Sequence, residues 1–319
     1  MNVVFMGTPD FAVPGLKSLV EAEHNVITVI TQTDKPKGRR RQLCAPPVKN
    51  VALDLDLQII QPENVNDEII VNKLREINPD VIVVAAFGQM ISSKILDLPR
   101  YKCINIHASL LPEYRGAAPI NWAVVNGEKE TGITSIVLQE KMDAGEMIVQ
   151  KTTKIGPDET AGELENRLSL LGAEVLIETL RQMEDGIAEY KPQDDESATF
   201  APKLKKKNGL IDWNQNAEDL HNFVRGMSPW PIAYTNLKRN TSKERIMILK
   251  TEKGGPSSAE LNKIPGTIED ISDRGIKVAT KSDSTCGLWI REVKPEGKRS
   301  MSAVDFSRGH DVKVDYLFR

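Results

Sequence analysis

The sequence contains few cysteines and no long hydrophobic run. Its 319 residues include only Cys44, Cys103 and Cys286, which are widely separated and odd in number. They predict neither a disulfide framework nor a zinc site, and no metal is expected. A reducing cytoplasm is the expected compartment. No apolar run approaches the roughly 18 residues that a membrane helix needs. Residues 1–7 have no basic stretch and no cleavage site, so we expect a first strand there and not a signal peptide.

The glycine fingerprint of dinucleotide-binding proteins is also missing. After an apolar run over residues 3–6, a single glycine, Gly7, is followed by Thr8 and Pro9, so the GxGxxG spacing is absent. This absence argues against a hydride-transferring enzyme that uses NAD. Thr8 and Pro9 suit the cap and first turn of a helix, whose N-terminus can bind an anion. Gly7 itself is explained equally well by the fold alone.

Charge is distributed unevenly along the chain, although the net charge is only −3. Residues 1–202 contain 20 Lys and Arg against 30 Asp and Glu, and residues 203–319 contain 22 against 15. Within the acidic half, residues 34–49 hold six basic side chains and one acidic one. An acidic body with a basic loop and a basic second half suits a protein that grips a polyanion at two places. A solvated loop is the alternative reading of residues 34–49.

The first part of the chain alternates short apolar runs with helix-like stretches. Such alternation predicts an α/β fold with a doubly wound, Rossmann-like, mostly parallel sheet. Ligands of such sheets bind at the carboxyl ends of the strands. The expected strands are residues 3–6, 26–31, 58–60, 81–85, 103–106, 134–138 and 147–152. The expected helices are residues 9–23, 48–55, 66–77, 92–96 and 160–184, the last with leucines at helical spacing.

A change in composition and in apolar pattern divides the chain into two parts. We expect a catalytic domain over residues 1–190 and a second, smaller domain over residues 209–319. Residues 191–208 contain prolines, acidic residues and four lysines but few apolar side chains, which is typical of a linker. Beyond them, short apolar runs broken by glycine and proline predict a small β-barrel of the OB type.

Polar side chains that could carry chemistry gather near residue 105. Asn105 and His107 lie two apart at the end of an apolar run, so on a strand both project from the same face. Two polar groups on one inward face cost free energy unless they serve a site. Asp143 lies in a predicted turn between two later strands. Asp-x-Gly is ordinary turn chemistry, and the spacing alone does not place Asp143 near His107.

A resemblance to a known family covers nearly the whole chain. The sequence resembles the methionyl-tRNA formyltransferases, which belong to the folate-dependent formyltransferases. The Asn-x-His pair and the Asp turn are typical of the whole superfamily, whereas the opening, the basic loop and the second domain favour tRNA as acceptor. The matching segments are residues 5–14, 47–49, 105–112, 114–119, 142–145 and 228–231.

The resemblance implies a reaction and a set of residues that carry it. The formyl donor would be 10-formyltetrahydrofolate, and the acceptor would be the α-amine of methionine esterified to initiator tRNA. Asn105 would stabilise the tetrahedral oxyanion, His107 would move the proton, and Asp143 would orient His107. No role follows for the cysteines. The residues implied for the folate site are Phe87, Gly88, Gln89, Ser109, Leu110, Leu111 and Pro112.

The same resemblance implies tRNA contacts in two basic segments. In the family, an insertion after the second strand reaches the acceptor stem, and three consecutive arginines occupy it here. Glu113 departs from the family, which often has a basic residue at that position. We expect a monomer with no membrane contact. The implied tRNA-binding residues are Lys35, Lys37, Arg39, Arg40, Arg41, Lys203, Lys205, Lys206 and Lys207.

Three other functions are compatible with parts of this pattern. A formyltransferase that acts on a nucleotide-sugar amine would share the site and an appended β domain. A formyltetrahydrofolate hydrolase would use water as acceptor and would leave the basic second half unexplained. A non-catalytic tRNA-binding module would not need Asn105, His107 and Asp143. An assay with charged initiator tRNA against sugar amines separates the acceptors.

Overall fold

The computed structural model describes residues 1–38, 42–239, 242–256, 263–281 and 286–319. The chain forms two compact units. Unit 1 comprises Met1–Pro119, Glu130–Lys154 and Leu164–Pro202. Unit 2 comprises Ile120–Lys129, Ile155–Glu163 and Lys203–Arg319. The polypeptide therefore crosses between the units several times before unit 2 continues without interruption.

Unit 1 is built on one seven-stranded sheet. Its strands are β1 (Asn2–Gly7), β2 (Asn25–Ile30), β5 (Ile59–Ile60), β6 (Val81–Ala85), β7 (Cys103–His107), β9 (Glu130–Val137) and β10 (Met147–Lys154). Their order is β10-β9-β7-β6-β1-β2-β5, and β9 alone is antiparallel to its neighbours. After β1 the chain adds β2 and β5 on one side of β1, and it then adds β6 on the other side. The strand order therefore reverses between β1 and β6. In open α/β sheets a reversal of this kind marks the expected ligand-binding edge.

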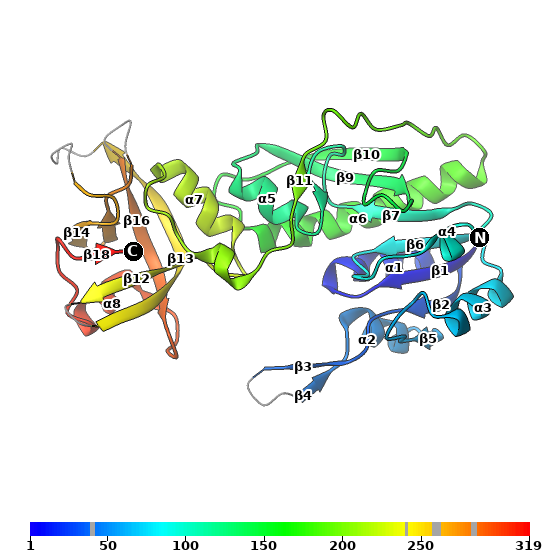
Figure 1. Cartoon of the computed structure of the whole chain (residues 1–319), viewed down its shortest axis with the longest axis horizontal. Helices are drawn as coiled ribbons and strands as arrows, with labels where there is room; N and C mark the ends of the chain where they lie inside the picture. Colours follow the sequence, from blue (N-terminus) through cyan, green and yellow to red (C-terminus); the bar gives the residue numbers. More distant parts are fainter. Residues whose placement is uncertain (39–41, 240–241, 257–262, 282–285) are drawn as a thin grey trace. The chain divides into compact units, whose positions relative to one another are not determined.

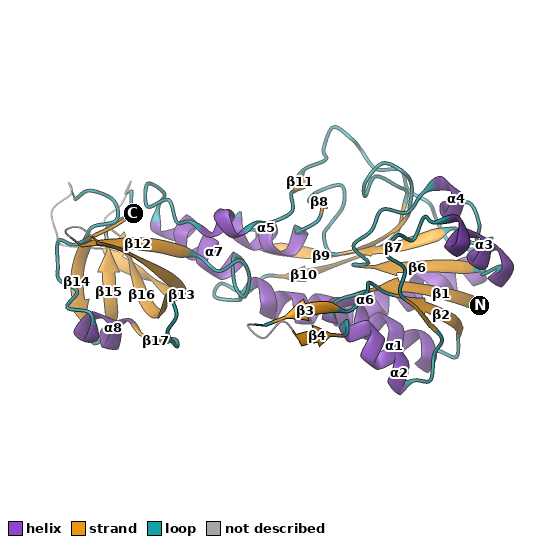
Figure 2. Ribbon diagram, turned by 60° about the horizontal axis from the view of Figure 1, so that its bottom comes forward, coloured by secondary structure: helices purple, strands orange, loops and turns teal. Residues whose placement is uncertain are grey.

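Helices cover both faces of this sheet. They are the 3-10 turn η1 (Asp10–Ala12) and the α-helices α1 (Val13–Glu21), α2 (Pro47–Asp54), α3 (Glu68–Ile77), α4 (Ser93–Leu96) and α6 (Ala161–Glu184). Figure 2 shows α3 and α4 on one side and α1, α2 and α6 on the other. Alternate strand residues such as Val4 and Ile82 enter a buried cluster with Leu74 of α3 and Ile95 of α4. On the opposite face, Gly172 of α6 lies against Ile106.

Two short strand pairs complete unit 1. The hairpin of β3 (Lys35–Lys37) and β4 (Gln42–Cys44) extends away from the sheet (Figure 1). In addition, β8 (Arg115–Gly116) pairs in parallel with β11 (Phe200–Ala201), although the paired residues are 85 positions apart in the sequence. Residues 191–202, the first part of the expected linker over residues 191–208, thus belong to unit 1.

Unit 2 contains an antiparallel sheet that curls toward closure. Its strands are β12 (Tyr234–Arg239), β13 (Ser242–Pro256), β14 (Ile268–Ser272), β15 (Gly275–Val278), β16 (Cys286–Pro295), β17 (Met301–Ser302) and β18 (Leu317–Phe318), in the order β14-β15-β16-β13-β12-β18 with β17 beside β16. An isolated bridge between Thr267, just before β14, and Leu317 of β18 joins the two edge strands of this sheet. The helices are α5 (Pro119–Val125), the 3-10 turn η2 (Lys206–Gly209), α7 (Ala217–Gly226) and α8 (Ala303–Gly309).

The predicted fold class is confirmed by the mostly parallel sheet and the antiparallel, barrel-like second sheet. The expected strand over residues 81–85 has the same bounds in the structure, and the expected helix over residues 160–184 differs by one residue. The β3–β4 hairpin, the β8–β11 pair and α8 were not expected. The described residues contain no helix that is both long and apolar enough to cross a membrane.

Substitutions on α3 should separate core packing from surface exposure. Leu74→Ala removes a fully buried side chain from the cluster shared with β1 and β6. We expect it to lower the free energy of unfolding by about 2–5 kcal/mol, because the lost contacts leave a cavity. Ile69→Ala on the same helix is the control, since Ile69 is 80% exposed, and it should change the free energy by less than about 0.5 kcal/mol. Urea denaturation measures both; equal effects would contradict this packing.

Candidate active site

Strand β7 presents Asn105 and His107 on the sheet face that is covered by α3 and α4. Cys103 lies two residues before Asn105 and four before His107. It belongs to the buried cluster on that face, and its thiol lies 3.7 Å from the carbonyl oxygen of Ile95. Ile106 contacts α6 on the other face. Strand alternation therefore directs Asn105 and His107 to the same side, at the carboxyl end of β7.

The turn between β9 and β10 brings Asp143 to these two residues. Asp143 Oδ1 accepts a long hydrogen bond of 3.4 Å from Asn105 Nδ2 and lies 3.7 Å from His107 Nδ1. Its Oδ2 accepts a hydrogen bond of 2.9 Å from the backbone N–H of Gly116. The carboxylate thus joins β7, the loop after β7 and the β9–β10 turn. The structure brings the three candidate catalytic side chains together.

The surroundings of His107 decide which ring nitrogen is available. His107 is 5% exposed, and its Nε2 lies 3.0 Å from the carbonyl oxygen of Tyr114. A carbonyl oxygen only accepts, so Nε2 carries a proton and donates it to Tyr114. In the neutral ring, Nδ1 then has a lone pair and faces Asp143 at 3.7 Å. Nδ1 is the nitrogen at which this imidazole can gain and lose a proton.

The loop after β7 is held by Thr134, a fully buried residue of β9 that the sequence did not single out. Thr134 Oγ1 donates 2.7 Å to the Ser109 carbonyl oxygen and accepts 3.2 Å from the Leu111 N–H. Gln150 Nε2 donates 3.0 Å to the Leu111 carbonyl oxygen. The implied folate residues Ser109 and Leu111 are therefore fixed through their backbone.

The other implied folate residues after β7 differ in exposure. The Ser109 hydroxyl donates 2.7 Å to the carbonyl oxygen of Glu113, and the Leu110 side chain packs at the backbone of Gly132 on β9. Leu110 and Pro112 are half-buried. Any ligand at this loop would thus meet the backbone and the edges of Leu110 and Pro112.

The implied folate residues after β6 form a tight turn at the neighbouring strand end. Phe87 is 2% exposed in the core, and its carbonyl oxygen accepts hydrogen bonds from Thr8 Oγ1 at 2.9 Å and Gln32 Nε2 at 3.0 Å. Gly88 has a φ of +86°. The Gln89 carboxamide accepts 2.8 Å from the Val65 N–H. This turn would therefore contribute a fixed backbone shape to a ligand site, because the Gln89 carboxamide is already bonded to the Val65 N–H.

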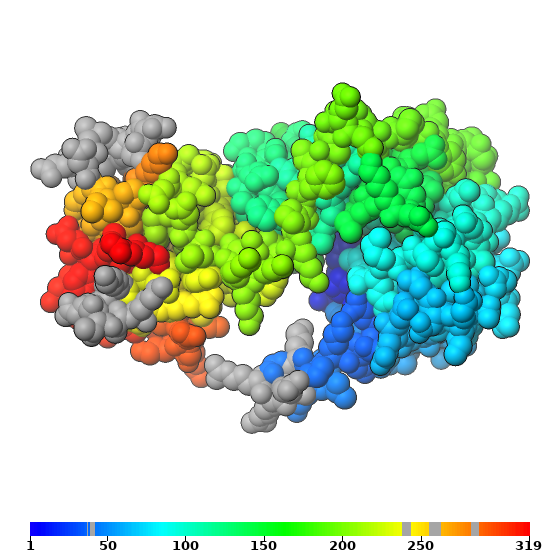
Figure 3. Space-filling model, viewed as in Figure 1, coloured from blue at the N-terminus to red at the C-terminus, as the bar shows by residue number. Residues whose placement is uncertain are grey.

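The implied tRNA-binding residues lie in exposed places where the structure describes them. Lys35 lies in the hairpin that stands out from unit 1, in the blue segment of Figure 3. Lys37 belongs to the same strand, whereas Arg39, Arg40 and Arg41 lie outside the described residues. Lys203, Lys205, Lys206 and Lys207 are exposed in unit 2.

The base of the hairpin is held by an ion pair. Lys49 Nζ lies 2.8 Å from Asp34 Oδ2, and Gln61 Nε2 donates 2.8 Å to Asp34 Oδ1. These hydrogen bonds from Gln61 and Lys49 lower the pKa of Asp34. Lys49 of the 34–49 segment is therefore used in an internal ion pair, whereas the Lys35 side chain is exposed to solvent.

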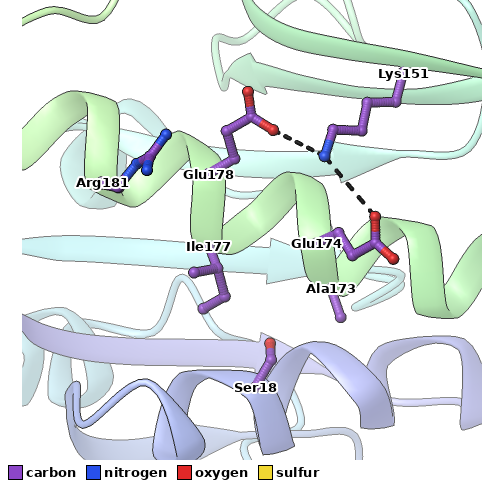
Figure 4. A pocket seen from close by; sticks show the side chains of 7 residues that line it. All are labelled: Ser18, Lys151, Ala173, Glu174, Ile177, Glu178 and Arg181. Atoms are coloured by element: carbon purple, nitrogen blue, oxygen red, sulfur yellow. Dashed lines mark ion pairs between the residues drawn. The ribbon is translucent and has the colours of Figure 1, made fainter.

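A shallow hollow lies on the opposite side of the sheet (Figure 4). Ser18 of α1, Lys151 of β10 and one face of α6 line it. Lys151 Nζ spans it to Glu178 at 2.8 Å and Glu174 at 3.8 Å. Helix α6 covers the face that carries Ile106, so this hollow is separate from Asn105 and His107. Among the described residues, no three His, Cys, Asp or Glu side chains are placed to hold a metal ion.

Comparison with known proteins gives matches along the chain. The model of the formyl transferase family matches residues 1–180, and that of the formyl transferase C-terminal domain matches residues 203–311. A methionyl-tRNA formyltransferase from Geobacter metallireducens is 47% identical, over 97% of this chain and 96% of the relative. One from Bacillus subtilis is 43% identical, over 98% and 96%.

Solved structures share the fold at low sequence identity. HypX from Aquifex aeolicus, in complex with tetrahydrofolic acid, superposes with a TM-score of 0.64 at 17% identity. The match covers 99% of this chain and 50% of that one, so this chain spans half of its length. The sugar 3N-formyl transferase WlaRD has a TM-score of 0.64 at 18% identity, over 94% and 99%.

The two described cysteine side chains should differ sharply in reactivity. Burial raises the pKa of the Cys103 thiol to about 12, whereas Cys44 is exposed. The thiolate is the reactive species, so at pH 8 Cys103 stays protonated and inert. In a Cys286→Ser background, iodoacetamide should modify Cys44 in the folded protein and both thiols in urea. Peptide mass spectrometry measures this; rapid modification of Cys103 in the folded protein would contradict the packing of β7.

Proposed function

The chain belongs to the methionyl-tRNA formyltransferase family, and from that membership we propose how its own residues carry out formyl transfer. The enzyme transfers a formyl group to the α-amine of methionine esterified to initiator tRNA, which gives N-formylmethionyl-tRNA. The observation that carries the residue assignment is the contact of one carboxylate, that of Asp143, with both Asn105 and His107.

The proposed formyl donor is 10-formyltetrahydrofolate, which acts as a substrate. Two neighbouring parallel strands, β6 and β7, end in the rigid turn at residues 87–89 and the braced loop at residues 109–112. Fixed backbone beside half-buried Leu110 and Pro112 suits a flat heterocycle with a hydrogen-bonding edge. The match to a structure described as a tetrahydrofolic acid complex agrees with this donor at the level of the fold.

In the proposed reaction, the methionyl amine attacks the formyl carbon on N10 of the folate. The carbonyl oxygen becomes an oxyanion, which collapses as the bond from carbon to N10 breaks. Asn105 Nδ2 carries two hydrogens and donates one toward Asp143. The other is free to meet the oxyanion, and a donor of this kind is typically worth about 10²–10³ in rate.

A proton must leave the amine and reach N10 in the same cycle. His107 Nδ1 takes the amine proton, because Nε2 is occupied by the Tyr114 carbonyl oxygen. The resulting imidazolium lies 3.7 Å from Asp143 Oδ1, where the carboxylate stabilises its charge. The same proton then passes to N10 as tetrahydrofolate leaves. The attacking amine is itself the nucleophile, so no covalent enzyme intermediate is required.

The proposed acceptor contacts are Lys35, Lys37, Arg39, Arg40 and Arg41 near the hairpin and Lys203, Lys205, Lys206 and Lys207 in unit 2. Basic side chains of this kind bind RNA phosphates, and residues 203–319 carry an excess of seven positive charges. We propose residues 1–190 as the catalytic domain and 209–319 as the tRNA-binding domain. Residues 191–208 lead from one to the other, and the part up to Pro202 belongs to unit 1. We also propose that the enzyme is a monomer and that it acts in the cytoplasm, with charged initiator tRNA as its acceptor.

Alanine substitutions test the three proposed roles. Asn105→Ala should lower kcat by about 10²–10³-fold through loss of the oxyanion donor. His107→Ala should lower it by about 10²–10⁴-fold through loss of the proton carrier, and Asp143→Ala should also lower it steeply. Formylation of charged initiator tRNA measures turnover, and circular dichroism checks the fold. Asn72→Ala, at an exposed position on α3, is the control. Near-normal turnover in any one variant removes that residue from the mechanism.

Deleting residues 36–41 tests the hairpin as an acceptor-binding element. The deletion should abolish formylation of tRNA but spare folate binding, because Thr8, Gln32 and Val65, which hold the turn at residues 87–89, lie outside the deleted residues. Tetrahydrofolate binding by calorimetry and formylation are measured side by side. A variant with Arg75→Ala and Lys94→Ala, two exposed basic residues, controls for lost charge. Loss of folate binding in the deletion variant would assign the hairpin a structural role.

A further inference from the structure

Residues 191–201, which we call the return segment, bind two loops of the site. At one end, the backbones of Lys191 and Met147 exchange hydrogen bonds of 2.8 and 2.9 Å just beyond the Asp143 turn. At the other end, β11 pairs with β8. There the Thr199 carbonyl oxygen accepts 2.9 Å from the Arg115 N–H, and Thr199 Oγ1 accepts 2.8 Å from the Tyr114 N–H. The segment thus links the turn that carries Asp143 to the loop that follows His107.

Between these anchors, the Gln193 carboxamide caps the Asp143 turn. Gln193 Nε2 donates 2.8 Å to the Asp143 carbonyl oxygen and 2.7 Å to that of Gly145. Both partners only accept, so the amide nitrogen must face them and the orientation of the carboxamide is settled. Gln193 is half-buried, whereas both of its chain neighbours are exposed. Its position reflects these contacts and not a general burial of the segment.

Arg115 holds the other end of the same carboxamide. Arg115 Nε donates 3.0 Å to Gln193 Oε1, and its Nη1 lies 2.7 Å from Asp195 Oδ1. Asp195 also pairs with Lys141, two residues before Asp143. Hydrogen bonds from Lys141 and Arg115 lower the pKa of Asp195, so this cluster stays charged at neutral pH. Arg115 is 2% exposed, and burying a guanidinium is costly unless it is paired.

The backbone of Asp143 is held directly by these contacts. Its φ is +49°, in the left-handed region, which Asp adopts more readily than most residues that carry a side chain. The hydrogen bonds from Gln193 to the carbonyl oxygens of Asp143 and Gly145 fix this turn. The direction of the carboxylate depends on this backbone, and so does its reach to Asn105 and His107.

We propose that Gln193, held by Arg115, is a positioning residue that fixes the 143–145 turn and thereby aims the Asp143 carboxylate at Asn105 and His107. This inference rests on the function proposed above for Asp143. Gln193 touches neither the reacting atoms nor the side chain of His107; it acts through the two backbone carbonyls. The return segment is therefore part of the working site and not a passive connection to unit 2.

The test replaces Gln193 with methionine, which keeps its length but lacks the amide donors. In the full-length enzyme, Gln193→Met should lower kcat by about 10- to 100-fold, as expected for a misplaced catalytic group, with KM for charged tRNA changed less than about twofold. Gln193→Glu should be at least as impaired, because it sets a carboxylate against two carbonyl oxygens. Gln182→Met, at a half-buried glutamine on α6, is the matched control and should keep normal turnover.

A double-substitution cycle separates positioning from a merely structural role. If Gln193 acts through Asp143, adding Gln193→Met to Asp143→Ala should cause no further loss of kcat. A multiplied loss in the double variant, or normal kcat in Gln193→Met, overturns the proposal. Near-normal turnover in Asp143→Ala alone would instead overturn the function proposed for Asp143, so the two failures are distinguishable.

A second variant keeps the test decisive if Gln193→Met does not fold. Asp195→Ala changes an exposed side chain and releases Arg115 from its ion pair. Asp195→Ala should lower kcat by a smaller factor than Gln193→Met does. This loss should appear only when Asp143 is present. Unchanged kcat in folded Asp195→Ala enzyme, with the thermal midpoint checked by circular dichroism, would overturn the role of Arg115 in holding Gln193.

Discussion

The arrangement of the site depends on the contacts of one group, the Asp143 carboxylate. One oxygen approaches Asn105 and His107 on β7, and the other accepts the Gly116 N–H from the loop after β7. Residues 105–116 and the turn at Asp143, which lie 27 or more residues apart in the sequence, therefore meet at one negative charge. Its side chain is 12% exposed, so hydrogen-bond donors must replace the water that it loses on folding. The amide of Asn105 and the backbone of Gly116 supply them.

Around this carboxylate, the sheet fixes the strand residues, and hydrogen bonds to the sheet fix the loops. Strand β7 is fixed between β6 and β9, so Asn105 and His107 have little freedom. The loops are then tied to the sheet and to each other, by Thr134 from β9 and by the return segment from the end of unit 1. A buried imidazole whose Nε2 is committed to Tyr114 can exchange protons only at Nδ1. In the proposed mechanism, the loop conformation thereby determines which nitrogen of His107 carries the transferred proton.

The parts that were predictable from the sequence are those whose signal is local. Strand β6 is a run of five buried residues, and α6 has leucines at helical spacing, so both were found with nearly their observed bounds. The β3–β4 hairpin was missed because Lys35–Lys37 and Gln42–Cys44 have neither apolar alternation nor β-branched residues. Strands β8 and β11 have two residues each and form only because distant segments meet.

The sequence by itself determined the family, the order of the elements and the common face of Asn105 and His107, because each depends on motif or on strand periodicity. Tertiary structure decided the rest. It placed Asp143 against β7, since spacing along the chain carries no information about a contact 36 residues away. It also turned residues 191–201 from a polar stretch typical of a linker into a support for the Asp143 turn. Polar segments without a core reveal their contacts only when the chain has folded, because each hydrogen bond needs a partner that a different segment supplies.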